Sequence, residues 1–411
     1  MRITRLEPGD QTVKIDFCAG EELKNSVFKI YYRQIGKRAK PKKVRVPSGE
    51  SAVRLTGLLN HTDYAAYVSA ENENGEETAR SGERLFRCGF VPGRVVAYLH
   101  PDDYTFASSG RSTCSPSIAR APDGALIVSH DIYWGRCGQN ITHIYRSEDN
   151  GESWRFLSGI TPCFWGSLFT HRGALYILGT STEYGALLLY RSADCGRTWG
   201  PPTEILPTGS SEKGGPHKAP MAVVEHGGRL WTGIEFGSWT TGMHMPGAVS
   251  ANVDSDLTDA KSWVCTGFLP YDETRPGVVK GFPRGGTIEG NIVTGPDGGL
   301  YDVLRYSTVG CEPSYGRAYV TKIDPSRPDK TPEFSKVIDF PGNLSKFFIL
   351  RDEKTGAYFA LSNRVTTGVL SQRNILSLSR SDDLEHWTLC RDILNYADNC
   401  FGEDEKKVGF Q

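Results

Sequence analysis

The stretch SEDNGESW at residues 147–154 decides the fold, because it returns as SADCGRTW at residues 192–199. Both copies fit the pattern Ser-x-Asp-x-Gly-x-x-Trp, and Tyr-Arg precedes each of them. The serine and aspartate side chains can bond nearby backbone N–H groups and close a turn, while the glycine supplies a positive φ. The tryptophan can cover the end of a sheet. We predict a hairpin turn in a unit that repeats after 45 residues, a period typical of propellers and solenoids.

The composition favours an all-β protein. The chain has 411 residues, of which 46 are Gly and 8 are Trp, and its length suggests two or three domains. A net charge of −1 provides no overall field that would attract nucleic acid or a membrane surface. No apolar run reaches the roughly 18 residues of a membrane span. We therefore expect neither a nucleic-acid nor a membrane partner.

The cysteines and the N-terminal sequence bear on location. Ten cysteines are scattered without CxxC pairs, which is typical of reduced thiols rather than of a disulfide framework or a zinc site. Residues 1–17 contain no apolar segment of the kind found in secretion signals. We expect a cytoplasmic protein without a metal or cofactor, with secretion left open. The oligomeric state is not predicted.

Residues 1–90 read as short strands with no helical pattern. The segment LLNHTDY at residues 58–64 resembles the L-x-P-x-T-x-Y tyrosine corner of fibronectin type III domains, with Asn60 in place of proline. The segment AENENG at residues 70–75 is also similar to that family, and Phe17 takes the place of its usual tryptophan. The resemblance implies a β-sandwich that acts as a spacer or docking module, so no catalytic residue is expected here.

A longer repeat fills residues 91–411. Each copy has an apolar strand, a short turn rich in Gly or Asp-Gly, and a second apolar strand, as in β-hairpins. Because the strands are apolar on both faces, we expect them to be central and buried. Five visible units of this kind predict a radial propeller. The five hairpins cover residues 115–131, 166–180, 218–235, 289–306 and 345–363.

Together, the hairpins and the Ser-x-Asp-x-Gly-x-x-Trp turns resemble the six-bladed sialidase fold, whose BNR repeats carry such turns as Asp-boxes. The resemblance runs from about residue 95 to the end. This resemblance implies a sialidase-type six-bladed β-propeller at residues 91–411. The earlier resemblance to fibronectin type III domains implies a sandwich at residues 1–90. Residues 408–411 read as the start of a sixth inner strand, so we expect the last blade to be incomplete by about 30 residues.

Glu289 and Arg305 are the sharpest pair of candidate site residues, because they bracket one hairpin. A carboxylate beside a guanidinium stays ionised and can act as a base or orient a nucleophile. A purely structural ion pair is the alternative. In sialidases the catalytic glutamate opens this hairpin and an arginine that binds the substrate carboxylate closes it, so the resemblance implies those roles for Glu289 and Arg305.

Polar residues at matched ends of the other hairpins are expected to converge on one end of the central channel. His217 can be an acid or base near neutral pH, and Lys218 can neutralise a sugar carboxylate; a solvated loop is the alternative. Asp131 can be the acid or can orient His130, and a His–Asp hydrogen bond without catalytic function is the alternative. The predicted catalytic residues are Glu289, Asp131 and His217. The predicted substrate-binding residues are Arg305, Lys218, His130, Asn291, Lys346, Arg364 and Trp165.

The chain departs from the sialidase pattern at several positions. Sialidases carry Arg-Ile-Pro where this chain has Ser-Pro-Ser at residues 115–117. The loop that should offer an acidic aspartate reads GRCGQN at residues 135–140, and Leu344 takes the place of the nucleophilic tyrosine. The third arginine of the family is Arg317 or Arg364. Strict sialidase activity is therefore not expected.

These patterns predict a carbohydrate-active enzyme, a glycoside hydrolase acting on a glycan with an acidic sugar, either sialic or uronic acid. Hydrolysis would use Glu289 and Asp131 as the carboxyl pair. A uronate-directed lyase would instead use His217 or His130 as the base. A glycan-binding propeller without turnover is the third possibility. The sugar and its linkage are left open.

Overall fold

The computed structural model describes residues 1–38, 40–104, 110–133, 138–281, 286–342, 344–366, 372–396 and 409–410. Within these ranges the chain forms antiparallel sheets and two 3-10 turns, η1 (Glu21–Leu23) and η2 (Ala260–Ser262), and no α-helix. The predicted all-β class is therefore confirmed. No helix in the described part is long and apolar enough to cross a membrane.

The chain divides into two compact units. The first comprises Met1–Thr113, Ile132–Gly138 and Ser147–Arg155, and the second comprises Cys114–Asp131, Gln139–Arg146 and Phe156–Gln411. The predicted domain boundary between residues 90 and 91 stays a prediction.

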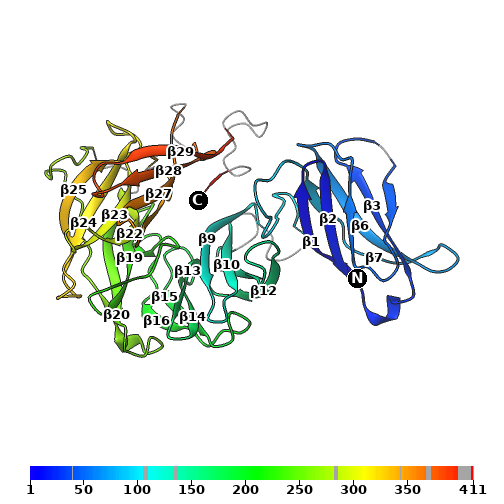
Figure 1. Cartoon of the computed structure of the whole chain (residues 1–411), viewed down its shortest axis with the longest axis horizontal. Coiled ribbons are helices and arrows are strands. Elements are labelled where there is room, and N and C mark those ends of the chain that lie inside the picture. Colours follow the sequence, from blue (N-terminus) through cyan, green and yellow to red (C-terminus); the bar gives the residue numbers. More distant parts are fainter. Residues whose placement is uncertain are drawn as a thin grey trace. The chain divides into compact units, whose positions relative to one another are not determined.

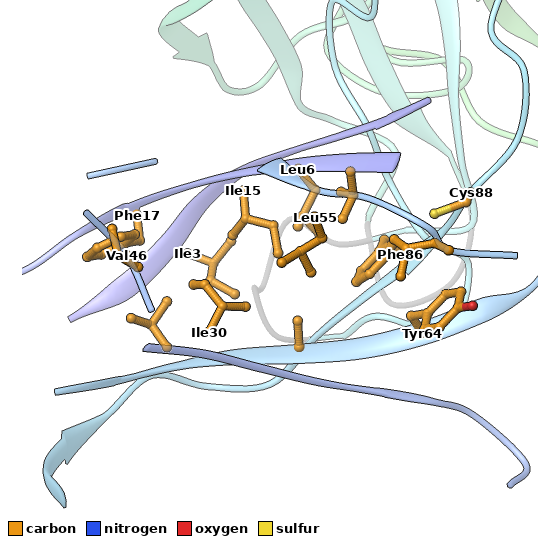
Figure 2. Packing of buried hydrophobic residues seen from close by; sticks show 14 residues of the cluster. Ile3, Leu6, Ile15, Phe17, Ile30, Val46, Leu55, Tyr64, Phe86 and Cys88 are labelled. Atoms are coloured by element: carbon orange, nitrogen blue, oxygen red, sulfur yellow. The ribbon is translucent and has the colours of Figure 1, made fainter. Parts of the chain in front are cut away.

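The first unit contains two sheets. One has the order β1 (Arg2–Gly9), β2 (Thr12–Cys18), β5 (Ala52–Leu55). The other has the order β4 (Lys42–Arg45), β3 (Val27–Gln34), β6 (Asp63–Glu71), β7 (Glu77–Arg80), with β8 (Arg84–Arg87) beside β6. Alternate residues of β2 point inward, as strand geometry requires, and pack with apolar residues of the other strands (Figure 2).

The predicted tyrosine corner is present in this unit. The Tyr64 hydroxyl accepts a hydrogen bond of 2.9 Å from the backbone N–H of Leu59. This bond back to a residue a few positions upstream is the geometry that defines such a corner. Tyr64 and Phe17 both belong to the buried cluster of the sandwich (Figure 2).

The second unit contains five sheets that follow one another in chain order, from cyan to red in Figure 1. Sheet 1 has β9 (Ser112–Arg120), β10 (Leu126–Tyr133), β11 (Thr142–Ser147) and β12 (Arg155–Ile160). Sheet 2 has β13 (Phe164–His171), β14 (Ala174–Thr180), β15 (Leu187–Ser192) and β16 (Thr203–Leu206). Sheet 3 has β17 (Gly215–His217), β19 (Arg229–Ser238), β20 (Met243–Asn252) and β21 (Trp263–Cys265), with β18 (Val224–His226) beside β19.

Sheets 4 and 5 repeat the same four-stranded meander. Sheet 4 has β22 (Gly286–Thr294), β23 (Leu300–Ser307), β24 (Arg317–Ile323) and β25 (Glu333–Asp339). Sheet 5 has β26 (Phe348–Arg351), β27 (Tyr358–Asn363), β28 (Ile375–Ser381) and β29 (Thr388–Asn395).

Polar contacts join each sheet to the next, and the last sheet to the first. They come from the first strands, from β19, or from residues directly beside them, so these parts of the five sheets gather around one centre. This is the radial arrangement of a β-propeller. The contacts are Leu168 N to Ser117 Oγ (2.9 Å), Lys218 Nζ to Ser167 Oγ (2.6 Å), Gly290 N to Glu235 Oε1 (3.0 Å), Asn291 Nδ2 to Phe347 O (3.1 Å) and Lys346 Nζ to Ser115 Oγ (3.5 Å).

The described residues hold five sheets in this unit, and the predicted count of six blades stays a prediction. Of the predicted sixth inner strand, Val408 and Gln411 lie outside the described residues and 409–410 form no strand. One prediction about the strands differs from the structure: the run predicted to begin at residue 218 is interrupted, because β17 ends at His217 and β18 begins at Val224. Pro220, which lies between them, has no N–H to donate to a sheet.

The turn predicted from residues 147–154 is formed. Ser147 Oγ donates to Asp149 Oδ1 (2.7 Å) and accepts from the N–H of Gly151 (2.7 Å), whose φ is +95°. The second copy makes the same two bonds at Ser192, with 2.8 Å for each. Both turns join the third and fourth strands of a sheet, so they lie at the outer side and not beside the first strands.

Candidate active site

Three first strands carry a residue with left-handed backbone at the matched position. The φ values are +55° at Ser115, +55° at Trp165 and +57° at Glu289. In β13 and β22 the pairing with the next strand shifts register at this point, as in a β-bulge. Such a conformation costs roughly 1–3 kcal/mol for a residue with a side chain and is concentrated at functional sites. The bulges therefore mark the candidate site independently of side-chain chemistry.

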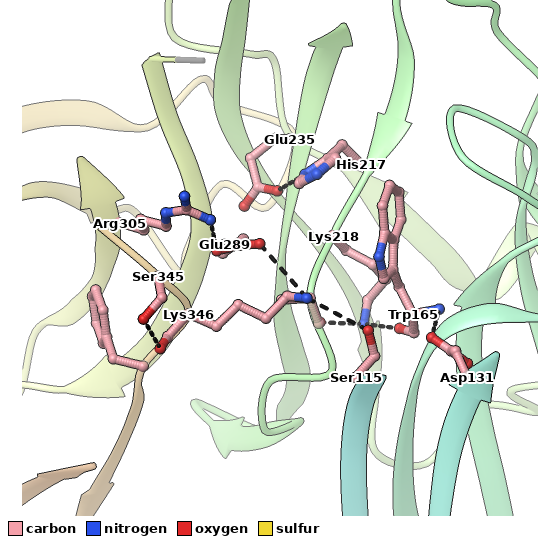
Figure 3. A network of polar contacts seen from close by, with 12 residues as sticks. Ser115, Asp131, Trp165, His217, Lys218, Glu235, Glu289, Arg305, Ser345 and Lys346 are labelled. Atoms are coloured by element: carbon pink, nitrogen blue, oxygen red, sulfur yellow. Dashed lines mark hydrogen bonds and ion pairs between the residues drawn. The ribbon is translucent and has the colours of Figure 1, made fainter. Parts of the chain in front are cut away.

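Glu289 is buried, yet its pKa is lowered; Figure 3 shows it between Arg305 and Lys346. Its Oε2 accepts a 2.8 Å hydrogen bond from Arg305 Nη1, and its Oε1 lies 3.8 Å from Lys346 Nζ. Burial alone would raise the pKa of Glu289, but the two positive charges outweigh it and hold that pKa at about 2. Two cations thus face one carboxylate, and the predicted pairing of Glu289 with Arg305 is present.

His217 and Glu235 form a second buried pair (Figure 3). His217 Nδ1 lies 2.9 Å from Glu235 Oε2, and the other oxygen of Glu235 accepts the N–H of Gly290 (3.0 Å). Burial lowers the pKa of His217 to about 3 and raises that of Glu235 to about 7. The imidazole is therefore neutral, and no residue of the described ranges bonds its Nε2.

Asp131 holds the bulge at Trp165. Its Oδ2 accepts the backbone N–H of Trp165 (2.7 Å), and its Oδ1 accepts the hydroxyl of Thr142 (2.5 Å). Burial raises the pKa of this carboxyl to about 7. Asp131 thus positions a neighbouring residue, and its role as the second catalytic carboxyl remains a prediction.

Lys218 is buried, with three neutral oxygens around its Nζ. It donates to Ser167 Oγ (2.6 Å), to the carbonyl of Ala219 (2.7 Å) and to the carbonyl of Trp165 (3.2 Å). Burial lowers the pKa of Lys218 to about 7. The amine therefore braces the Trp165 bulge from sheet 3, on the side opposite Asp131 of sheet 1 (Figure 3).

Aromatic rings surround His217. Trp165 lies 4.5 Å from it and His244 lies 4.7 Å from it, measured between ring centroids. Tyr184 contacts both histidines at 6.4 Å and 6.0 Å. Close packing of this kind keeps the imidazole in a low-dielectric setting, which explains its lowered pKa.

Three predicted substrate-binding residues have other partners. Asn291 bonds the carbonyl of Phe347 and the N–H of Ile349, both at 3.1 Å, and so joins sheets 4 and 5. Arg364 makes two bonds to the Asp392 carboxylate, at 2.8 and 2.6 Å. His130 packs on the ring of Tyr145 at 5.5 Å, and burial lowers its pKa to about 4.

The structure therefore brings together Glu289, Arg305, Lys346, His217, Lys218 and Trp165 from the predicted set (Figure 3). It adds Glu235 as the partner of His217. The two residues are directly opposite each other in the β17–β19 pairing, so hairpin register was the signal that could have revealed them as a pair. Within the described ranges, no group of three or more His, Cys, Asp or Glu side chains is arranged to hold a metal ion.

Comparison with models of protein families finds no match, and comparison with curated proteins finds none. Among solved structures, an α-L-arabinanase of Penicillium chrysogenum complexed with arabinobiose is similar at 17% identity, with 68% of this chain and 80% of that chain covered and a TM-score of 0.46. An α-L-arabinofuranosidase of Fusarium graminearum is similar at 13% identity with the same coverage and a TM-score of 0.45. The FN5 domain of Drosophila Lar matches 21% of this chain and 91% of its own, at 19% identity and a TM-score of 0.19. Likenesses this distant define neither the activity nor the substrate of this chain.

Proposed function

We propose that this protein is a carbohydrate-active enzyme, a glycoside hydrolase whose substrate carries an acidic sugar. The observation that carries the proposal is the group of Glu289, Arg305 and Lys346 beside His217. One ionised carboxylate lies between two cations, next to a neutral imidazole that can exchange a proton. Glycosidases need a base or nucleophile and a separate proton donor at the same bond.

The acidic sugar follows from the local charge. Arg305 and Lys346 together carry two positive charges against the single negative charge of Glu289, so the group has a positive excess. A sugar carboxylate would neutralise that excess, and Arg305 offers the planar donor geometry that carboxylates fit. In this proposal Glu289 is the base or nucleophile, and His217 is the acid–base group.

A panel of fluorogenic glycosides tests the proposal. The panel contains sialosides, glucuronides and galacturonides, together with the matching neutral sugars. We expect release of the fluorophore only from acidic sugars. Turnover of neutral sugars alone, or binding of acidic glycans without turnover, would contradict it; the second result would establish the glycan-binding alternative.

A uronate lyase is the second candidate, and the His217–Glu235 pair favours it. A neutral imidazole held at Nδ1 can take a proton at Nε2, while Arg305 and Lys346 stabilise the carboxylate next to the carbon that loses it. The C–O bond to the leaving sugar then breaks, a double bond forms in the uronate, and the proton taken up by His217 passes to the oxygen of the leaving sugar. Incubation with uronosides separates the two reactions, because only elimination yields a product that absorbs in the ultraviolet.

We also propose a six-bladed sialidase-type propeller, which rests on exposed apolar residues of sheets 1 and 5. Leu350 of sheet 5 is 58% exposed, and Ile118 and Phe156 of sheet 1 are 60% and 55% exposed. Phe348, which shares a face with Leu350 and pairs with Leu361, is also exposed. One more sheet between sheets 5 and 1 would cover these residues. A crystal structure with five blades closed directly on each other would overturn this proposal.

The sandwich of the first unit supports a fibronectin type III assignment. It has two facing antiparallel sheets, of three and five strands, and the Tyr64 corner of that family. With residues 1–90 as this domain and 91–411 as the propeller, the candidate site belongs wholly to the second.

A further inference from the structure

We propose that Glu235 is a positioning residue that decides which nitrogen of His217 carries the proton and holds the backbone next to Glu289. The inference deepens the proposed function. Its kinetic consequences rest on that function, whereas the position of the proton on His217 does not. The two oxygens of Glu235 connect two strands of the site, because Oε2 lies 2.9 Å from His217 Nδ1 and Oε1 accepts the N–H of Gly290.

Two glycines bring Glu235 within reach of β22. A Cβ at Gly233 of β19 would lie 3.0 Å from the carbonyl oxygen of Gly290, and a Cβ at Gly290 would overlap the carboxylate of Asp302. Glycine at 233 therefore lets β19 of sheet 3 approach β22 of sheet 4 closely, while glycine at 290 leaves room for Asp302 of its own sheet. Glu235 lies two residues beyond Gly233, on the same face of β19, and so its carboxyl meets the N–H of Gly290.

The bond to Gly290 fixes the residue that follows the bulge. Glu289 has a left-handed φ of +57°, which is costly for a residue with a side chain. Its side chain is tied to Arg305, and the N–H of the next residue is tied to Glu235. Hydrogen bonds therefore fix both the side chain of Glu289 and the backbone that follows it. The bond from Glu235 is the one that comes from a different sheet.

The same bond decides where a proton on Glu235 resides. Because Oε1 already accepts the N–H of Gly290, a proton on Oε1 would weaken that bond, whereas a proton on Oε2 leaves it undisturbed. Oε2 faces His217 Nδ1 at 2.9 Å. A protonated Glu235 therefore donates to Nδ1, and the neutral imidazole then carries its own hydrogen on Nε2. An ionised Glu235 accepts from Nδ1, and Nε2 then presents a lone pair.

Glu235 thus sets whether His217 is ready to give or to take a proton. The pKa of Glu235, raised to about 7 by burial, places this change in the neutral range. The charged and titratable groups that act most strongly on the pair come from sheets 3 and 4 and from residues directly beside sheets 3 and 5. They are Glu289, Arg305 and Asp302 of sheet 4, Lys218 and His244 of sheet 3, and Lys346 beside sheet 5.

Nitrogen-15 NMR of selectively histidine-labelled protein tests the proton placement without any substrate. The resonances of His217 are assigned by their loss in His217→Asn. In the wild type we expect the hydrogen on Nε2 at about pH 5.5 and on Nδ1 at about pH 8.5. In Glu235→Gln the side-chain amide donates to Nδ1 at every pH, so the hydrogen should stay on Nε2 throughout. The same tautomer in wild type and variant across this range would overturn the inference.

Enzyme kinetics test the second role of Glu235, which is to hold the backbone next to Glu289. Glu235→Gln keeps an oxygen for Gly290, whereas Glu235→Ala loses both bonds. We expect kcat to fall about 100-fold in Glu235→Gln with KM little changed and the alkaline limb of the pH profile lost, and to fall further in Glu235→Ala. Glu225→Gln, an exposed change on β18 of the same sheet, is the control and should behave as wild type. Equal losses in the two Glu235 variants would overturn the role at Gly290.

The two proposals can fail separately. If no glycan is turned over but the His217 tautomer follows Glu235 as described, the enzymatic function fails and the proton placement stands. If acidic glycans are turned over and Glu235→Gln matches Glu225→Gln in rate and in the NMR titration, the role of Glu235 fails and the enzymatic function stands.

Discussion

At the scale of single residues, buried carboxyl groups of similar chemistry have pKa values shifted in opposite directions. Arg305 and Lys346 flank Glu289 and lower its pKa, whereas burial dominates at Glu235 and Asp131 and raises their pKa values. Environments that push the pKa values of neighbouring acids apart are how enzymes assign acid and base roles. This division is visible only once the neighbours of each side chain are known.

Asp131 provides a prediction at this scale. Asparagine can replace a protonated carboxyl, accept the N–H of Trp165 with its oxygen and bond Thr142 with its amide. Asp131→Asn should therefore keep the free energy of unfolding within about 1 kcal/mol of wild type, while Asp131→Ala should lose roughly 1–3 kcal/mol, because it leaves a buried N–H unbonded. Urea unfolding measures both. A stable Asp131→Asn protein without activity would instead make Asp131 the catalytic acid that the sequence pattern suggests.

At the scale of elements, the first strands combine regular pairing with one left-handed residue. Ser115, Trp165 and Glu289 occupy matched positions, and each is followed by Pro or Gly and then by a polar residue that bonds the neighbouring sheet. A bulge turns one side chain toward the centre without ending the strand. The repeat therefore positions both the site residues and the contacts between sheets.

The turn motif yields a prediction for these elements. Gly196 of the second copy has φ +89°, and a Cβ there would lie 3.2 Å from Leu157 Cδ2. Gly196→Ala should lower the free energy of unfolding by about 1–2 kcal/mol, because alanine is strained in the left-handed region. Thermal unfolding measures the loss. Since the turn is on the outer side of sheet 2, catalytic constants should not change; a selective loss of activity at full stability would contradict the assignment of this motif to the fold alone.

Much of this organisation is readable from the sequence, for local reasons. The Ser147 turn depends on residues within a few positions, and Glu289 and Arg305 meet because they end one hairpin. Contacts between sheets cannot be predicted from the sequence in this way. The bond from Glu235 to Gly290 depends on how closely two sheets approach, and the Arg364 carboxylate partner Asp392 lies on β29, outside its hairpin. Strand periodicity does not encode such distances, so the radial placement of the sheets had to be known first.

At the scale of the whole molecule, a chain of polar contacts runs from sheet 1 to sheet 5 and back to sheet 1. The step between sheets 5 and 1 is the longest of those between first strands, at 3.5 Å from Lys346 Nζ to Ser115 Oγ. Lys346 also lies beside Glu289, so one side chain belongs both to the site and to the contact between sheets 5 and 1. Stability and site geometry are therefore coupled at this residue.

Asp302 links the stability of the molecule to pH. It is buried in sheet 4, and desolvation raises its pKa well above the usual value. A carboxyl whose pKa is raised by folding favours the native state below its unfolded pKa, near 3.8, and this contribution is lost as the pH rises toward the folded pKa. Asp302→Asn has no such titration. Relative to wild type, its free energy of unfolding should increase between pH 4 and pH 7, because only the wild type loses this contribution as the pH rises. Denaturant unfolding at both pH values checks this; a constant difference would contradict it.

The most direct test of the account is kcat/KM of Glu289→Gln on the best acidic glycoside of the panel. Glutamine keeps the size of the side chain but removes the charge between Arg305 and Lys346. The matched control is Asp297→Asn, at the exposed turn of the same β22–β23 hairpin. The account predicts a loss of about 1,000-fold or more in Glu289→Gln and wild-type activity in the control. Undiminished turnover in Glu289→Gln would contradict the assignment of this site as the active site.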